Sequence, residues 1–286
     1  MRLILQLSVL CLAAGASACS TPEKIIATED IPTAGLRFIN AVPDTGAMDF
    51  RFVDIVESNA HFNIAFRNNP VTTAGVTSST QIEYKNTRAG QRRFRIFMSG
   101  NTAAIASTVV RDTTVTIEAG RLYTAILWGN ARPGSATPMR LTIITETAAD
   151  PGAQVALRVI NAAPSVGAVD ARSYPSTGTA PAAATWANVA PLTASTYATA
   201  APSQMRINVQ PAGGGAVLFA DALALIGAPY ASDLEGLPGS TIAGTALSAI
   251  IFPRSVAGSR APQTAAFAAP SISFVWDRRP PRIPGS

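Results

Sequence analysis

The chain has 286 residues and a net charge of +5, with 48% hydrophobic and 14% charged residues. This length fits one or two domains, and the small share of charged residues excludes an intrinsically disordered chain. One His and two Cys exclude most zinc sites and disulfide-stapled scaffolds, and they argue against His-dependent catalysis. The basic residues are scattered rather than gathered beside aromatic side chains, so we expect no nucleic-acid binding.

The first 19 residues have the pattern of a bacterial export signal. Arg2 precedes an apolar run from Leu3 to Ala14, and small residues continue to Cys19. The apolar run is too short to span a bilayer, and no later stretch is long and apolar enough to do so. We therefore expect export, removal of residues 1–18 and no integral membrane domain.

The processing site can be read in two ways. Ala16-Ser17-Ala18 fits ordinary signal peptidase, which would leave Cys19 as a free N-terminal thiol. Ala-Ser-Ala-Cys also resembles a bacterial lipobox, although the consensus has Leu where Ala16 stands. Cys11 leaves with the signal, so Cys19 has no intrachain partner, which favours lipidation. We expect lipid on Cys19 to anchor the protein at the outer membrane or on the periplasmic or cell-surface side.

Two segments of the chain are copies of one another. LRFINAVPDTGAMD at 36–49 and LRVINAAPSVGAVD at 157–170 agree at nine of fourteen positions, with an offset of 121. Such self-similarity indicates a duplication. The sequence predicts a tether at 19–35, one repeat at 36–150, a second at 151–277 and a Pro/Arg tail at 278–286. We expect residues 277–282, from Asp277 to Arg282, to be extended and exposed.

The segments between turns have strand character. Phe94, Ile96 and Met98 alternate with polar residues on a half-buried strand at 93–98. Further short strands are predicted at 36–39, 122–128, 141–144, 157–160, 205–210 and 246–252. Short strands separated by Gly and Pro predict an all-β chain of two tandem antiparallel β-sandwich domains, Ig-like or Greek-key in type. We expect each domain to fold on its own.

The motif resembles a known family. The pattern Asn-Ala-x-Pro-x-x-x-Ala-x-Asp, followed by Gly120-Arg121-Leu122-Tyr123-Thr124-Ala125, is similar to the bacterial domain of unknown function family 4397. The resemblance covers residues 36–150, and less closely residues 157–277, where Leu247-Ser248 replaces Tyr123-Thr124. It implies an exported or lipid-anchored protein with all-β domains, often in tandem, and it implies no activity.

The repeated motif supplies the candidate site residues, which are Asn40, Pro43, Asp49, Asn161, Pro164 and Asp170. Asp49 together with Asp44 and Asp54 could form a calcium loop, because hard cations prefer clustered oxygens. The second repeat carries Ser165 and Pro175 at the last two positions, so only one carboxylate is retained. We therefore expect a structural turn, fixed by side-chain bonds to backbone groups, and no metal, cofactor or catalytic residue.

Two other features have ordinary explanations. His61 is the single His, no Gly-x-Ser-x-Gly nucleophile elbow is present, and a polar loop position is expected for it. Arg92, Arg93 and Arg95 are expected mostly on a solvated strand face, where they could also contact anionic lipid or polysaccharide.

These observations favour a non-catalytic, lipid-anchored cell-envelope protein whose β-sandwiches serve an interaction or structural role. Its partners would be the membrane, through Cys19, and an envelope protein or polysaccharide. The alternative is a carbohydrate- or small-ligand-binding envelope protein that uses loops at one end of a sandwich. A secreted hydrolase is the third reading.

Overall fold

The computed structural model describes residues 30–55, 62–68, 82–229 and 236–280. The chain divides into two units, Met1–Ile31 and Pro32–Ser286, and the architecture below is that of the second unit. Within the described ranges, no helix is long and apolar enough to cross a membrane.

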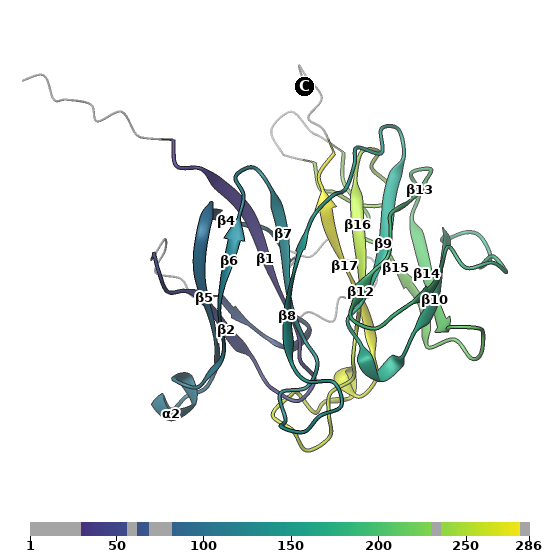
Figure 1. The fold of residues 1–286 in the computed structure, drawn as a ribbon. Coiled ribbons are helices and arrows are strands. Elements are labelled where there is room, and N and C mark those ends of the chain that lie inside the picture. The colour runs from purple at the N-terminus through teal and green to yellow at the C-terminus, as the bar shows by residue number, and fades with distance from the viewer. Residues whose placement is uncertain (1–29, 56–61, 69–81, 230–235, 281–286) are drawn as a thin grey trace, which may run out of the picture. The chain divides into compact units, whose positions relative to one another are not determined.

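The first repeat forms two four-stranded sheets (Figure 1). The inner sheet has the order β4-β1-β7-β8 and consists of Lys85–Arg88, Thr33–Ala41, Leu122–Trp128 and Arg140–Thr145. The outer sheet has the order β3-β2-β5-β6 and consists of Phe62–Ile64, Met48–Phe52, Gly90–Met98 and Val109–Ile117. Two short helices, η1 at Phe66–Asn68 and α2 at Ala103–Ala106, lie in the connections.

The second repeat has the same plan. Its inner sheet has the order β12-β9-β16-β17, at Thr193–Ala194, Val155–Asn161, Ala246–Phe252 and Ser271–Arg278, and β13 at Ala198–Ala200 also pairs with β9. Its outer sheet has the order β11-β10-β14-β15, at Trp186–Val189, Val169–Pro175, Met205–Pro211 and Phe219–Leu223. The helices η2 at Pro164–Val166 and η3 at Ala265–Phe267 complete it.

The predicted all-β sandwich class is confirmed, with one difference inside each repeat. The pairings β1–β7 and β9–β16 are parallel, whereas the sequence reading expected antiparallel strands throughout. Every residue of β9 and β16 is buried, and strands covered on both faces carry near-continuous apolar runs. The inner sheets are therefore central layers, and the outer sheets cover one face of each.

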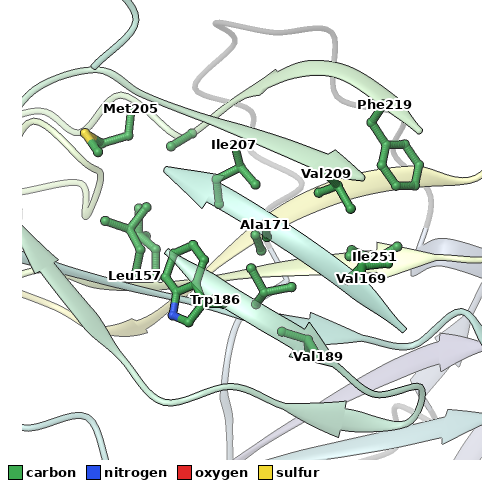
Figure 2. Close-up of a cluster of buried hydrophobic side chains, with 14 of the residues drawn as sticks. Leu157, Val169, Ala171, Trp186, Val189, Met205, Ile207, Val209, Phe219 and Ile251 are labelled. Carbon is green, nitrogen blue, oxygen red and sulfur yellow. The ribbon is translucent and has the colours of Figure 1, made fainter. Parts of the chain in front are cut away.

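Each repeat has its own hydrophobic core between its inner and outer sheets. In the first repeat, the rings of Phe38, Phe50 and Phe94 pack with centroids 4.9 to 5.9 Å apart. In the second, Trp186 belongs to one cluster with side chains from β9, β10, β14 and β16 (Figure 2). The alternating pattern that predicted these strands therefore corresponds to residues facing a real core.

A third apolar cluster joins the two repeats through the other faces of the inner sheets. Successive strand residues point to opposite faces, so Phe38 contacts the first core while Ile39 joins the shared cluster. The cluster contains Ile39, Ala41, Ile126, Trp128, Ile160, Ala162, Ile250, Phe252 and Val275. In Figure 1 the β1–β7–β8 layer accordingly lies beside the β9–β16–β17 layer. Because this core is shared, we expect the two repeats to fold together and not as independent domains.

Arg92 differs from its expected place on a solvated face, because its side chain is buried. Its guanidinium lies over the Phe52 ring, 4.3 Å from the centroid, and its Nε donates to Asp54 at 2.8 Å. Alternation along β5 places Arg92 on the inward face together with Phe94. Arg93 and Arg95 lie on the other face and both pair with Asp112.

Candidate functional site

The two motif asparagines occupy equivalent buried positions and make equivalent bonds. Asn40 accepts from the Val42 amide at 3.2 Å and donates to the carbonyls of Gly46 and Ile64 at 3.2 and 3.1 Å. Asn161 accepts from Ala163 at 3.2 Å and donates to Gly167 and Val189 at 2.8 and 3.1 Å. Each side chain thus ties the end of an inner strand to the following turn and to an outer-sheet strand.

The motif aspartates also bond within the protein. Asp49 accepts from Asn63 Nδ2 at 2.7 Å and from Arg51 at 2.9 Å. Asp170 accepts from the backbone amides of Asn188 and Gly213 at 2.8 and 3.1 Å, and these bonds lower its pKa below the ordinary value.

The acidic residues of the calcium alternative have separate partners. Asp44 accepts from the backbone amides of Ala131 and Arg132, both at 2.9 Å, while Asp54 binds Arg92. Across the described ranges, no group of three His, Cys, Asp or Glu side chains is placed to hold a metal ion. Cys19 and His61 lie outside the described residues.

A cluster of charges that the sequence reading missed lies between the two inner sheets. Arg37 on β1 donates from Nε to Thr124 Oγ1 on the parallel neighbour β7, at 2.7 Å. Its Nη2 donates to Glu146, just beyond β8, at 3.3 Å, and its Nη1 donates to the Trp276 carbonyl at 2.5 Å. Arg37 shares a strand face with Ile39 of the shared apolar cluster, so its side chain lies on the side of the inner sheet that is turned toward the second repeat.

The second repeat supplies the matching half. Arg158 on β9 donates from Nε to Ser248 Oγ on its parallel neighbour β16 at 2.7 Å, as Arg37 does to Thr124. Asp277 on β17 accepts from Ser248 at 2.6 Å and from the Tyr197 hydroxyl at 2.9 Å. The register of β17 against β16 shifts beside Asp277, and such irregularities re-aim side chains. Asp277 is 1% exposed, so the expectation that it begins an exposed tail is wrong.

The closest ion pairs cross from one repeat to the other. Arg37 Nη2 lies 2.5 Å from Asp277 Oδ1, and Arg158 Nη2 donates to Glu146 Oε2. The pairs within a repeat are longer, at 3.3 Å for Arg37–Glu146 and 3.6 Å for Arg158–Asp277. The four side chains are 0 to 4% exposed and their formal charges sum to zero. A buried charge is tolerated only when it is paired and hydrogen-bonded, as these four are.

Aromatic side chains cover the arginines of the cluster. The Arg37 guanidinium lies 4.6 Å from the Tyr84 ring centroid, and the Arg158 guanidinium lies 4.7 Å from that of Tyr197. Burial raises the pKa of both tyrosines above their ordinary value, so their hydroxyls stay protonated. Burial alone would lower the pKa of Arg37, but the negative groups around it raise it above the ordinary value.

A third arginine, Arg67 on η1, joins the repeats at the opposite end of the shared cluster. It is 2% exposed and its guanidinium donates to the backbone carbonyls of Pro253, Ala266 and Ala269 in the second repeat. The rings of Phe66 and Phe267 lie beside it, with centroids 5.3 and 5.2 Å away. Burial lowers its pKa to about 10, and it remains charged at neutral pH.

A cavity of about 600 Å³ opens beside this contact. Both motif prolines, Pro43 and Pro164, line it, together with parts of the loop after β7 (129–130 and 135–137) and of the loop after β16 (253–257, 262–264 and 267–268). The Val256 amide donates to the Pro43 carbonyl at 2.8 Å and joins the two sides. This volume lies within the range of small-molecule sites. The polar side chains of the repeated motif and of the charge cluster already bond to other groups of the chain. The cavity is therefore the candidate ligand site.

The sequence contained a signal for the charge cluster but none for the cavity. Arg37 and Arg158 are among the nine residues shared by the two motifs, and each interrupts an apolar strand. An arginine retained in both copies of an apolar segment needs a buried acidic partner. The cavity is built by loops, and hydrophobic periodicity does not predict the course of a loop.

Comparison with protein families found a match. Residues 34–172 match the family described as domain of unknown function (DUF4397). The matched range begins in β1 and ends in β10, so it includes both motif copies as well as Arg37, Glu146 and Arg158. Among curated proteins, no match was found. The resemblance inferred from the motif is confirmed over residues 34–172, where the chain is similar to the family DUF4397.

Proposed function

We propose that this protein is a lipid-anchored cell-envelope protein with a non-catalytic interaction or structural role. The observation that carries the proposal is the use of the repeated polar residues. The motif asparagines and the charge cluster of Arg37, Glu146, Arg158 and Asp277 bond to other groups of the same chain. Residues that bond in this way stabilise the β-sandwich scaffold. We expect the surface of that scaffold to bind partners.

The N-terminal sequence supports the envelope location. Arg2, the apolar run and the small residues before Cys19 have the order of an export signal, and Cys19 has no partner once Cys11 has been removed. A diacylglyceryl group together with an N-terminal acyl chain would give stable membrane attachment, because each buried methylene contributes about 0.8 kcal/mol.

Detergent partitioning of the full chain, produced in a bacterium with the lipoprotein pathway, tests the anchor. The wild type should enter the detergent phase and stay with membranes after a high-salt wash, which removes proteins held by charge alone. Cys19→Ala keeps the Ala-x-Ala site, so the variant should be exported and soluble. A soluble wild type with an unmodified N-terminal Cys by intact mass would show ordinary secretion instead.

A second candidate function is binding of a carbohydrate or another small ligand at the loop end of the sandwiches. The cavity lined by Pro43 and Pro164 favours it, since its volume of about 600 Å³ fits a small molecule and both repeats contribute to its walls. Titration of the purified protein with candidate ligands, followed by NMR, tests this candidate separately from the anchor.

A further inference from the structure

We propose that the cavity between the repeats binds an acidic sugar, with Arg254 as the group that selects its carboxylate. This inference rests on the second candidate function and adds to it a ligand class and a residue that determines specificity. Arg254 follows β16 and lines the cavity, and its side chain is exposed.

The first argument is the charge of the cavity wall. Arg254 is the single charged residue among the described residues that line the cavity, and none of them is acidic. The nearby carboxylate of Asp44 is 7% exposed, and its two oxygens already accept from backbone amides. A guanidinium with no competing carboxylate favours an anion, and its planar fork matches a carboxylate group.

The second argument comes from the repeat. Arg254 stands at the position of Asn130, by the offset of 124 that relates β16 to β7. The Asn130 amide donates to Ser135 and Thr137 at 2.9 and 3.2 Å and so holds its own loop together. Arg254 makes no hydrogen bond or ion pair with any described residue. The same position is thus used structurally in one repeat and is available to a ligand in the other.

The third argument concerns the body of the ligand. Ser255 is another residue of the cavity wall, and its hydroxyl oxygen is buried and has no hydrogen-bond partner within the described part of the chain. A buried polar atom without a partner is costly, and rotation of this side chain toward the cavity would let the hydroxyl bond to a ligand hydroxyl. Pro43, Pro164 and Pro253 present apolar faces to the same space. A compact ring with hydroxyls, apolar C–H edges and one carboxylate fits these three features together.

Isothermal titration of the purified full-length protein with D-glucuronate and D-galacturonate tests the inference, with D-glucose, acetate and inorganic phosphate as comparison probes. We expect saturable binding of at least one acidic sugar, weakened at least tenfold by Arg254→Gln and weakened by Ser255→Ala. Arg132→Gln is the matched control, because it removes another exposed arginine, from the loop after β7, that is not among the residues lining the cavity. This control should bind like the wild type.

Three results would overturn the inference. Equal binding of glucose, with no effect of Arg254→Gln, would leave a ligand site but remove its acidic selectivity. Equal binding of acetate or phosphate would show an anion site that does not recognise a sugar. Absence of saturable binding by every probe would overturn both the inference and the second candidate function, while the anchor proposal would still rest on its own partitioning test.

Discussion

Arg37 and Asp277 lie 240 positions apart in the chain, yet the guanidinium of one is 2.5 Å from the carboxylate of the other. Both side chains are fully buried, and this contact is shorter than the one between Arg37 and Glu146 of its own repeat. The closest ionic contact of the first inner strand is therefore made with the last strand of the second repeat.

The first prediction concerns this pair. Asp277→Asn preserves side-chain volume but leaves two buried arginines with one carboxylate, and loss of one partner from a buried pair typically costs 3–5 kcal/mol, a range we expect here. Urea unfolding at pH 7 measures the change. Asp112→Asn is the control, since Asp112 pairs with exposed arginines and should cost far less.

The double variant Arg37→Leu/Asp277→Leu removes one charge of each sign and leaves a neutral cluster. It should therefore be more stable than Asp277→Asn, because apolar residues replace buried ion pairs at little or no cost in many proteins. If the double variant loses as much stability as Arg37→Leu and Asp277→Leu lose together as single variants, the two residues are independent, and their assignment to one cluster is contradicted.

The second prediction concerns the folding unit. A fragment of residues 32–150 would expose Ile39, Ile126 and Trp128 of the shared cluster and leave Arg37 and Glu146 without their partners in the second repeat. We expect it to melt without a cooperative transition and to bind a hydrophobic dye. Addition of a 151–286 fragment should restore a cooperative melt. A sharp melt of the first fragment alone would show that each repeat is an independent domain.

The third prediction compares the two motif asparagines. Asn40→Ala and Asn161→Ala each leave two carbonyls and one backbone amide without their side-chain partner, which we expect to cost about 1–3 kcal/mol. Because the geometries match, the losses in the free energy of unfolding should agree within about 0.5 kcal/mol. Asn86→Ala, on an exposed position of β4, is the control and should be close to neutral.

The fourth prediction concerns acid stability. The backbone amides of Asn188 and Gly213 lower the pKa of Asp170 in the folded protein. Its stabilising contribution is therefore complete above the unfolded pKa of about 4 and is lost as the pH falls through the lower, native value. The stability difference between wild type and Asp170→Asn should shrink from pH 6 to pH 3. A difference independent of pH would show that the charge of Asp170 contributes nothing.

The strands of this fold could be predicted from the sequence because their periodicity is local. Phe94 and Ile96 alternate with polar residues, and the predicted strand at 122–128 has the bounds of β7. The parallel partner of β1 could not be predicted, because pairing depends on a connection of many residues. A near-continuous apolar run indicates that a strand is buried on both faces, but it does not identify the layer that covers it.

The contacts within the motif were accessible to sequence reasoning, whereas the contacts across the repeats were not. An Asn that bonds to the backbone two residues later is a local device. Asp277, in contrast, stands beside a run of Arg and Pro that is typical of an exposed tail, and only the register of β17 against β16 turns it inward. The retained arginines Arg37 and Arg158 indicate that buried acidic partners exist, but local composition does not identify which carboxylates they are.

The crossed pairing of Arg37 with Asp277 and of Arg158 with Glu146 has the pattern of an isologous contact, in which each half offers the same groups and receives the same groups in return. The two repeats therefore meet in the way that the subunits of a symmetric homodimer meet, although one chain carries both. A substitution in one repeat changes one of the two crossed pairs, whereas the same substitution in a homodimer would change both.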